Sequence, residues 1–301
     1  MKSLRILSLL PAATEIVYLL GLEKYLVGVS HECDFPAEVK NKPKVTTSLV
    51  SNNMTSKEID DKVKKVGHRG SGVFHIKEGV LKKLKPNLIL TQELCEVCAI
   101  TPPVILRSEG GPSKRDKNLK IISLEPEGVE DILNNILLIG EATGRQKQAE
   151  KVVEKLKKRF EKVHRRLLPL NQVQGRNDGK RPRVLIIEWL DPLMVAGHWV
   201  PEMVNIAGGV NLLTKPGERS KYININQILL SNPDILIISP CGFDIQRIIK
   251  EKPLIDRIVK KLPENVKVYL IDGNAYMTRP GPRVVDGIEI LAKFIQSLRG
   301  A

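Results

Sequence analysis

Aromatic residues are scarce in this chain, and cysteines and long apolar runs are scarcer. Only 4% of the 301 residues are Phe, Trp or Tyr, so the core is expected to be mainly aliphatic. Four cysteines are too few for a disulfide scaffold, which a chain of this length does not need. No apolar run reaches the roughly 18 residues of a membrane span, so no membrane insertion is expected.

The start of the chain resembles a signal peptide only superficially. Lys2 and Arg5 precede an apolar run, but Pro11 interrupts this short run and Thr14 and Glu15 follow it. The pattern is more typical of a strand that leads into a helix. Because no lipoprotein-type cysteine follows, the sequence predicts a cytoplasmic protein, exported only if a signal was removed.

The net charge is +14, from 48 Lys and Arg residues against 34 Asp and Glu. A nucleic-acid interface would need this charge gathered on one face, with aromatic side chains for stacking. Many basic residues instead fall in a predicted helix, where Glu150, Glu154 and Glu161 alternate with them. A solvated face with i,i+4 ion pairs explains this pattern, so no specific nucleic acid is expected. Anionic partners or surfaces remain the alternative. The abundance of Lys, Glu and Ile is typical of a thermophile.

The two halves of the chain follow one plan. Short apolar runs at residues 5–10, 85–91 and 118–124 correspond to runs at residues 183–188, 232–239 and 265–271. Pro86 precedes Asn118 by 32 residues, and Pro233 precedes Asn265 by the same interval. Continuous runs of Ile, Leu and Val are typical of strands buried on both faces of a largely parallel sheet. The sequence predicts an α/β fold with two similar, Rossmann-like lobes.

A long amphipathic helix is expected to join the lobes. After a first helix that ends near Gly144, residues 145–168 carry one apolar stripe, made of Val152, Val153, Leu156, Phe160, Val163 and Leu167. We therefore predict an N-terminal lobe at residues 1–126, connecting helices at residues 127–168 and a C-terminal lobe at residues 169–301. A small-molecule ligand is expected in the cleft between the lobes.

Ligands of open α/β sheets bind at the carboxyl ends of the strands. The segments that follow the predicted strands contain all four cysteines and both tryptophans. Such clustering is typical of a pocket with apolar walls and a few placed polar groups. The predicted ligand-binding residues are Pro11, Thr14, His31, Glu32, Gln92, Glu188, Trp189, His198, Trp199, Phe243, Asn274, Tyr276 and Arg279.

Several of these residues have more than one interpretation. Cys95 and Cys98 have metal-knuckle spacing, and His31 with Cys33 could complete a zinc or iron site, although buried cysteines also pack as small hydrophobes. His31 or His198 could bind a chelated metal or simply line the pocket. The two tryptophans suit a large planar ligand but are also common core residues. Arg279 and Arg283 could clamp anionic groups, or Arg283 could pair with Asp286.

Five segments carry a more specific resemblance: RILSLLPAATEIVYLLGL, LVGVSHECDFP, PNLILTQELCEVCAI, EWLDPLMVAGHWVPEMVNIAGG and VYLIDGNAYMTRPGPRVVDGIEIL. They resemble the helical-backbone metal receptors, and more narrowly the cobalamin-binding-protein-like branch of the substrate-binding proteins of metal-chelate ABC transporters. The resemblance covers essentially the whole chain. It implies two α/β lobes joined by one long helix, as in class III periplasmic binding proteins.

The resemblance also implies a ligand, namely a corrinoid such as cobalamin or a comparable iron or haem-like chelate. The protein would act as a carrier, a sensor or a transporter-associated receptor, with an ABC transporter permease as partner if it is exported. The alternative is a metal-dependent enzyme, a hydrolase or a corrinoid-modifying activity, that uses the His, Cys and carboxylate cluster. No motif fixes a nucleophile with its base, so a binding protein is favoured.

Overall fold

A computed structural model describes residues 4–51, 53–67, 72–93, 99–108, 118–167 and 181–298. The chain divides into two compact units. The first comprises Met1–Met54, Glu58–Pro126 and Leu133–Val152. The second comprises Thr55–Lys57, Glu127–Ile132 and Val153–Ala301. Each unit contains a sheet and its helices, so each is described separately.

The first unit is built on a four-stranded parallel sheet, in the order β2-β1-β5-β6. Its strands are β1 (Ile6–Ser8), β2 (Leu26–Val29), β5 (Leu88–Thr91) and β6 (Lys120–Ser123). β3 (Thr46–Ser48) and β4 (Phe74–Ile76) form a separate antiparallel pair. The helices before β6 are α1 (Pro11–Leu19), α2 (Ser56–Gly67), α3 (Glu78–Leu84) and α4 (Pro102–Arg107), with 3-10 turns at Glu23–Tyr25 and Ala37–Asn41.

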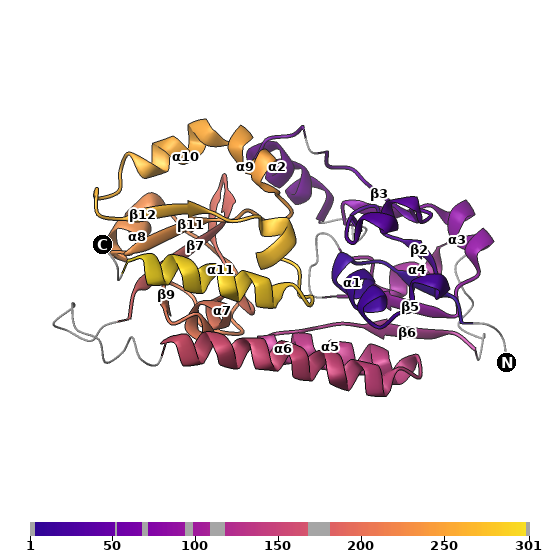
Figure 1. The fold of residues 1–301 in the computed structure, drawn as a ribbon. Helices are drawn as coiled ribbons and strands as arrows, with labels where there is room; N and C mark the ends of the chain where they lie inside the picture. Colours follow the sequence, from indigo (N-terminus) through magenta and orange to yellow (C-terminus); the bar gives the residue numbers. More distant parts are fainter. Residues whose placement is uncertain are drawn as a thin grey trace. The chain divides into compact units, whose positions relative to one another are not determined.

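The second unit contains the longer sheet, in the order β10-β8-β7-β11-β12, with β9 also paired to β7. Its strands are β7 (Arg183–Leu190), β8 (Leu193–Val195), β9 (Val210–Asn211), β10 (Lys221–Tyr222), β11 (Ile235–Ile238) and β12 (Lys267–Leu270). The helices are α7 (Val200–Ile206), α8 (Ile225–Leu230), α9 (Ile245–Lys250), α10 (Lys252–Val259) and α11 (Val284–Ser297). Figure 1 shows α9 and α10 on one side of this sheet and α7 and α11 on the other.

Equivalent hydrogen bonds form at the beginning of the first sheet strand of each unit, β1 and β7. The Arg5 backbone N–H donates to the Asn87 side-chain oxygen at 2.8 Å, and the Asn87 N–H donates back to the Arg5 carbonyl at 3.0 Å. Arg183 and Asp234 exchange the equivalent bonds, both at 2.8 Å. In each unit the first strand then pairs in parallel with the strand after the Pro-Asn or Pro-Asp step. The predicted internal correspondence is confirmed at this level.

Two consecutive helices, α5 (Val129–Ala142) and α6 (Gln146–Leu167), each have residues in both units. α5 ends before Gly144, whose φ of +68° is accessible to glycine at little cost. α6 then runs for 22 residues, and Val153, Leu156 and Val163 form its buried face. Gly140 of α5 lies against Ala149 of α6 with no room for a Cβ. The long helix predicted at residues 145–168 is confirmed.

The α/β fold with largely parallel, apolar strands is confirmed, but several details differ from the sequence-based prediction. The sequence also predicts an amphipathic helix at residues 76–84, whereas in the structure Ile76 ends β4 and the helix begins at Glu78. The antiparallel strands β8 and β10 were missed because they are short and partly exposed. The predicted lobe boundaries at residues 126 and 168 stay a prediction. Within the described residues, no helix combines the length and apolarity needed to cross a membrane.

Candidate functional site

In the first unit, four parallel strands end at one edge of the sheet. The chain passes from β1 to β2 on one side and later adds β5 and β6 on the other side, so the strand order reverses between β1 and β5. Such a reversal is the usual position of a ligand in open α/β sheets. Pro11 follows β1 and Gln92 follows β5, while His31 and Glu32 follow β2. Apart from the buried Thr14, the described ligand candidates of this unit therefore lie at the expected edge.

His31 is held by the β3–β4 pair. The Thr46 hydroxyl oxygen accepts a hydrogen bond from the His31 backbone N–H at 2.9 Å and lies 2.7 Å from Nδ1 of the ring. The ring packs edge-on against Phe74, with centroids 4.6 Å apart. Burial, together with Lys44 and Lys77, lowers the pKa of His31 to about 4, so the imidazole is neutral at pH 7. In the tautomer in which Nδ1 donates to Thr46, Nε2 retains the lone pair that binds metals.

Thr14 and Cys33 are buried beneath this edge. Thr14 is 0% exposed, and its hydroxyl bonds to the Ser8 hydroxyl at 2.8 Å and to the Cys33 sulfur at 3.1 Å. These contacts fix the turns after β1 and β2. Cys95 and Cys98 lie outside the described residues. Among the residues that are described, no three His, Cys, Asp or Glu side chains are grouped to hold a metal ion. The Cys and His metal site remains a prediction.

In the second unit, backbone bonds connect the carboxyl end of β7 to the segment that follows β11, and that segment to the turn after β12. The Cys241 N–H donates to the Glu188 carbonyl at 2.9 Å, and the Asn274 N–H donates to the Phe243 carbonyl at 3.1 Å. Trp189 and Phe243 meet edge to face, with ring centroids 5.4 Å apart. The Arg247 guanidinium lies 4.2 Å from the centre of the Phe243 ring. Four of the predicted ligand residues, Glu188, Trp189, Phe243 and Asn274, therefore share this edge.

The turn after β12 adds Tyr276 and two arginines. A single π-helical turn, Gly273–Met277, lies so close to the carbonyl oxygen of Pro240 that a Cβ on Gly273 would collide with it. Arg279 is 8% exposed and donates to the Asn274 side-chain oxygen at 2.6 Å. The Arg283 guanidinium lies 5.9 Å from the Tyr276 ring centre. Asp286, which the sequence offered as a partner of Arg283, accepts a hydrogen bond from the Arg159 guanidinium of α6 at 2.5 Å.

Trp199 is a core residue of the second unit. It is 5% exposed, and its indole N–H donates to the Met277 carbonyl at 2.8 Å. This bond connects the start of α7 to the π-helical turn. Trp189, by contrast, is only half-buried. Of the two tryptophans, Trp189 is therefore the one with indole surface available to a ligand.

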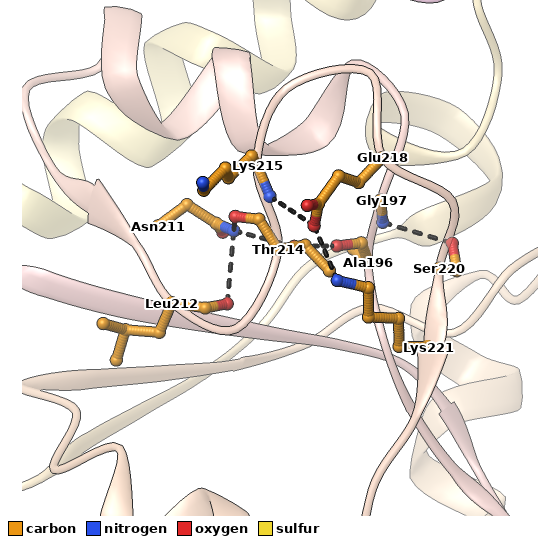
Figure 2. Close-up of polar contacts among 9 residues, drawn as sticks. All are labelled: Ala196, Gly197, Asn211, Leu212, Thr214, Lys215, Glu218, Ser220 and Lys221. Carbon is orange, nitrogen blue, oxygen red and sulfur yellow. Dashed lines mark hydrogen bonds and ion pairs between the residues drawn. The ribbon is translucent and has the colours of Figure 1, made fainter.

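The loop that contains His198 is stabilised by the segment at residues 211–221 (Figure 2). The Thr214 hydroxyl donates to the Ala196 carbonyl at 2.6 Å, and the Gly197 N–H donates to the Ser220 hydroxyl at 3.1 Å. The Glu218 carboxylate accepts from the Lys215 N–H at 3.1 Å and from the Lys221 ammonium at 2.7 Å. Because Gly197 contacts the backbone of residues 218–220, a side chain there has no room.

His198 itself has an unusual backbone conformation. Its φ is +55°, a left-handed value that costs a non-glycine residue on the order of 1 kcal/mol. The ring is half-buried beside Trp199, with centroids 5.8 Å apart. Burial and then Arg219 lower the pKa of His198, and Glu127 opposes them. A strained backbone at a strand-end loop, with a histidine whose pKa is lowered by burial, is characteristic of functional positions.

Sequence analysis missed the residues that support these side chains. Thr46 and Phe74 contact His31, Arg247 covers Phe243, and Ser220 binds Gly197. Thr46 is 15 residues from His31, and Phe74 is more than 40 residues from it. No local pattern connects them, since Thr46 and Phe74 lie in strands of only three residues, which are too short to show a periodicity. Only the hydroxyl and aromatic character of these side chains offered a signal.

The α/β units, with their largely parallel sheets, define a class III, periplasmic-binding-protein-like architecture. The family model of the periplasmic binding proteins matches residues 6–272, and the chain belongs to that family. An uncharacterized ABC transporter substrate-binding lipoprotein of Bacillus subtilis is 24% identical over 97% of this chain and 79% of its own length. The vitamin B12-binding protein of Vibrio cholerae is 22% identical over 97% of this chain and 89% of its own length. The periplasmic heme-binding protein RhuT of Roseiflexus has the same fold, with a TM-score of 0.66, 20% identity and 98% of both chains covered.

These relatives overturn the predicted cellular location, and they favour one of the two predicted functions. The predicted cytoplasmic location is wrong, because the family and the relatives are periplasmic proteins or lipoproteins, which are exported. The prediction relied on the first residues of the given sequence, and family membership overrides it. The three relatives are named as binding proteins, which favours a substrate-binding protein over the enzyme alternative. Thermophilic origin stays a prediction.

Proposed function

We propose that the protein binds a corrinoid such as cobalamin and serves as the substrate-binding protein of an ABC importer. The observation that carries the proposal is the strand-end cluster of the second unit. There the half-buried Trp189 provides aromatic surface, supported by the buried Phe243 ring, and Tyr276 with Arg283 adds an amphipathic edge. A large, partly flat ligand with polar side groups suits such a combination of aromatic faces and guanidinium donors. The vitamin B12-binding relative supports the choice of ligand.

Haem is the second candidate, and His31 is the observation that favours it. Its imidazole is neutral at pH 7, and Thr46 fixes the ring through Nδ1. A neutral imidazole in a fixed orientation is a competent axial ligand for haem iron. The heme-binding protein of Roseiflexus shares the fold, which is compatible with this ligand but does not select it.

Titration of the purified protein with cobalamin, cobinamide and haemin distinguishes these ligands. We expect cobalamin to quench the fluorescence of Trp189 in a saturable way with one ligand per chain. Haemin binding through His31 would instead produce a shifted Soret band that the His31→Ala variant loses. Failure of all three ligands to bind would refute the metal-chelate proposal.

The partner that this function requires is a membrane permease. Reconstitution of the protein with a candidate ABC importer permease from the same organism, in vesicles, would test delivery. Uptake of labelled cobalamin that depends on the protein is the expected result, and uptake that is equal without it would contradict the transport role.

A further inference from the structure

The exposed face of α6 carries a continuous line of positive charge. Lys147, Lys151, Lys155, Lys158, Lys162 and Arg165, here called the basic stripe, follow one another at intervals of three or four residues. Such intervals place side chains on one side of a helix. All six are exposed, and they extend for about 27 Å at 1.5 Å per residue. α6 as a whole has nine Lys and Arg residues against three Glu.

Two cations of α6 that form ion pairs with other helices, Lys157 and Arg159, lie off this stripe. Lys157 pairs with Glu130 at 2.7 Å, and Arg159 bonds to Asp286 at 2.5 Å and to Glu289 at 2.9 Å. Within the stripe, Lys158 pairs with Glu154 at 2.6 Å and Arg165 with Glu161 at 3.6 Å, both on the same helix. Such exposed pairs contribute little to stability. The hydrogen bond from Arg159 lowers the pKa of Glu289 in α11, and Lys162 contributes to this lowering. Internal ion pairing therefore accounts for only part of the line of charge.

We propose that the basic stripe docks the protein on an anionic lipid surface. A straight row of ammonium and guanidinium groups is complementary to a plane of phosphate headgroups, where each Lys or Arg contributes about 1 kcal/mol. The stripe has no apolar side chain to insert and no aromatic side chain to stack on bases, so contact with lipid is peripheral and electrostatic. One relative is named as a substrate-binding lipoprotein of an ABC transporter, which favours a lipid surface over other polyanions.

Docking would keep a diffusing substrate-binding protein close to the membrane that holds its permease. The orientation would be set by α6, whose opposite side is buried against the protein through Leu156 and Val163. The inference does not depend on which ligand is bound, because none of the six residues belongs to the strand-end sites.

Co-sedimentation of the full chain with vesicles tests the proposal. We expect binding to vesicles that contain phosphatidylglycerol and none to phosphatidylcholine alone. Binding should be lost between 0.1 M and 1 M salt, where the screening length falls from about 10 Å to about 3 Å. The quadruple variant K147Q/K151Q/K155Q/K162Q should bind at least tenfold more weakly, because it removes four of the six positive charges. It leaves the ion pairs of Lys158 and Arg165 intact.

Two matched variants make the result decisive. K82Q/K83Q/K250Q/K260Q removes the same charge from exposed lysines elsewhere and should bind within twofold of the wild type. K147R/K151R/K155R/K162R keeps the charge and should also bind. An equal loss of vesicle binding in both glutamine variants would overturn the assignment to the stripe. Wild-type protein that does not bind vesicles containing phosphatidylglycerol would overturn it as well. Equally tight binding of duplex DNA or soluble polyphosphate through the stripe would overturn the assignment to lipid.

Discussion

The backbone N–H of His198 donates a hydrogen bond to the carbonyl oxygen of Glu218, with the two atoms 2.6 Å apart. The His198 carbonyl in turn accepts from the Gly217 N–H at 3.0 Å. This reciprocal pair holds His198 at its φ of +55°. The conformation of a proposed ligand residue thus depends on a loop that follows it by 20 residues.

Gly197→Ala should disrupt this arrangement. A Cβ at residue 197 would collide with backbone atoms of residues 218–220. Unlike the end of a flexible side chain, these atoms cannot move aside. We expect a loss of about 1–3 kcal/mol in the free energy of unfolding, measured by urea denaturation. Gly79→Ala is the control, because nothing lies within 4 Å of its Cβ position in α3. An equal effect of both substitutions would show that the loop contact is not the cause.

His198→Gly should separate ligand binding from stability. Glycine adopts a positive φ without strain, so relief of strain offsets the lost imidazole contacts. We expect the free energy of unfolding to change by less than about 1 kcal/mol, while cobalamin affinity falls at least tenfold. Asn232→Gly provides the control, since Asn232 has a φ of 42° at the amino end of β11, away from the strand-end sites. Unchanged affinity in His198→Gly would remove His198 from the proposed site.

The two tryptophans should respond in opposite ways. Trp199→Phe removes the indole donor to Met277 inside the core, so we expect a loss of about 1–3 kcal/mol in stability. Trp189→Phe alters a half-buried ring and should leave stability nearly unchanged. Cobalamin should still quench the fluorescence of Trp199→Phe, whereas quenching should largely disappear in Trp189→Phe. Quenching that persists in Trp189→Phe would place the ligand elsewhere.

Strand positions could be predicted from the sequence because an apolar run between polar turns has few alternatives. The equal spacing of Pro86 to Asn118 and of Pro233 to Asn265 further indicated that these runs form equivalent strands in the two units. The strand-end location of Trp189, Phe243 and Asn274 followed directly from this. Which side chains are exposed did not follow, because burial depends on segments distant in the chain. Thr14 is covered by Cys33, and Trp199 is covered by the turn at Met277.

The equivalence of the two units can itself be measured. Asn87→Ala and Asp234→Ala each remove the acceptor of a backbone N–H at the start of the first strand of a unit. Each should lower the free energy of unfolding by about 1–2 kcal/mol. The exchanges Asn87→Asp and Asp234→Asn retain an acceptor oxygen and should cost less than half as much. Alanine variants no less stable than the exchange variants would contradict a shared role for this bond.

Acid should destabilise the protein through His31. Its pKa is about 4 in the folded protein and about 6.5 when unfolded, so the unfolded chain binds more protons between these values. The free energy of unfolding should therefore fall as the pH decreases from about 6.5 to about 4. The contribution is on the order of 1 kcal/mol, since the ring is only partly buried and solvent screens it. His31→Gln should flatten the pH dependence of urea unfolding over this range. His75→Gln, at an exposed histidine of β4, should retain the wild-type slope. A slope that survives in His31→Gln would assign the acid sensitivity to another group.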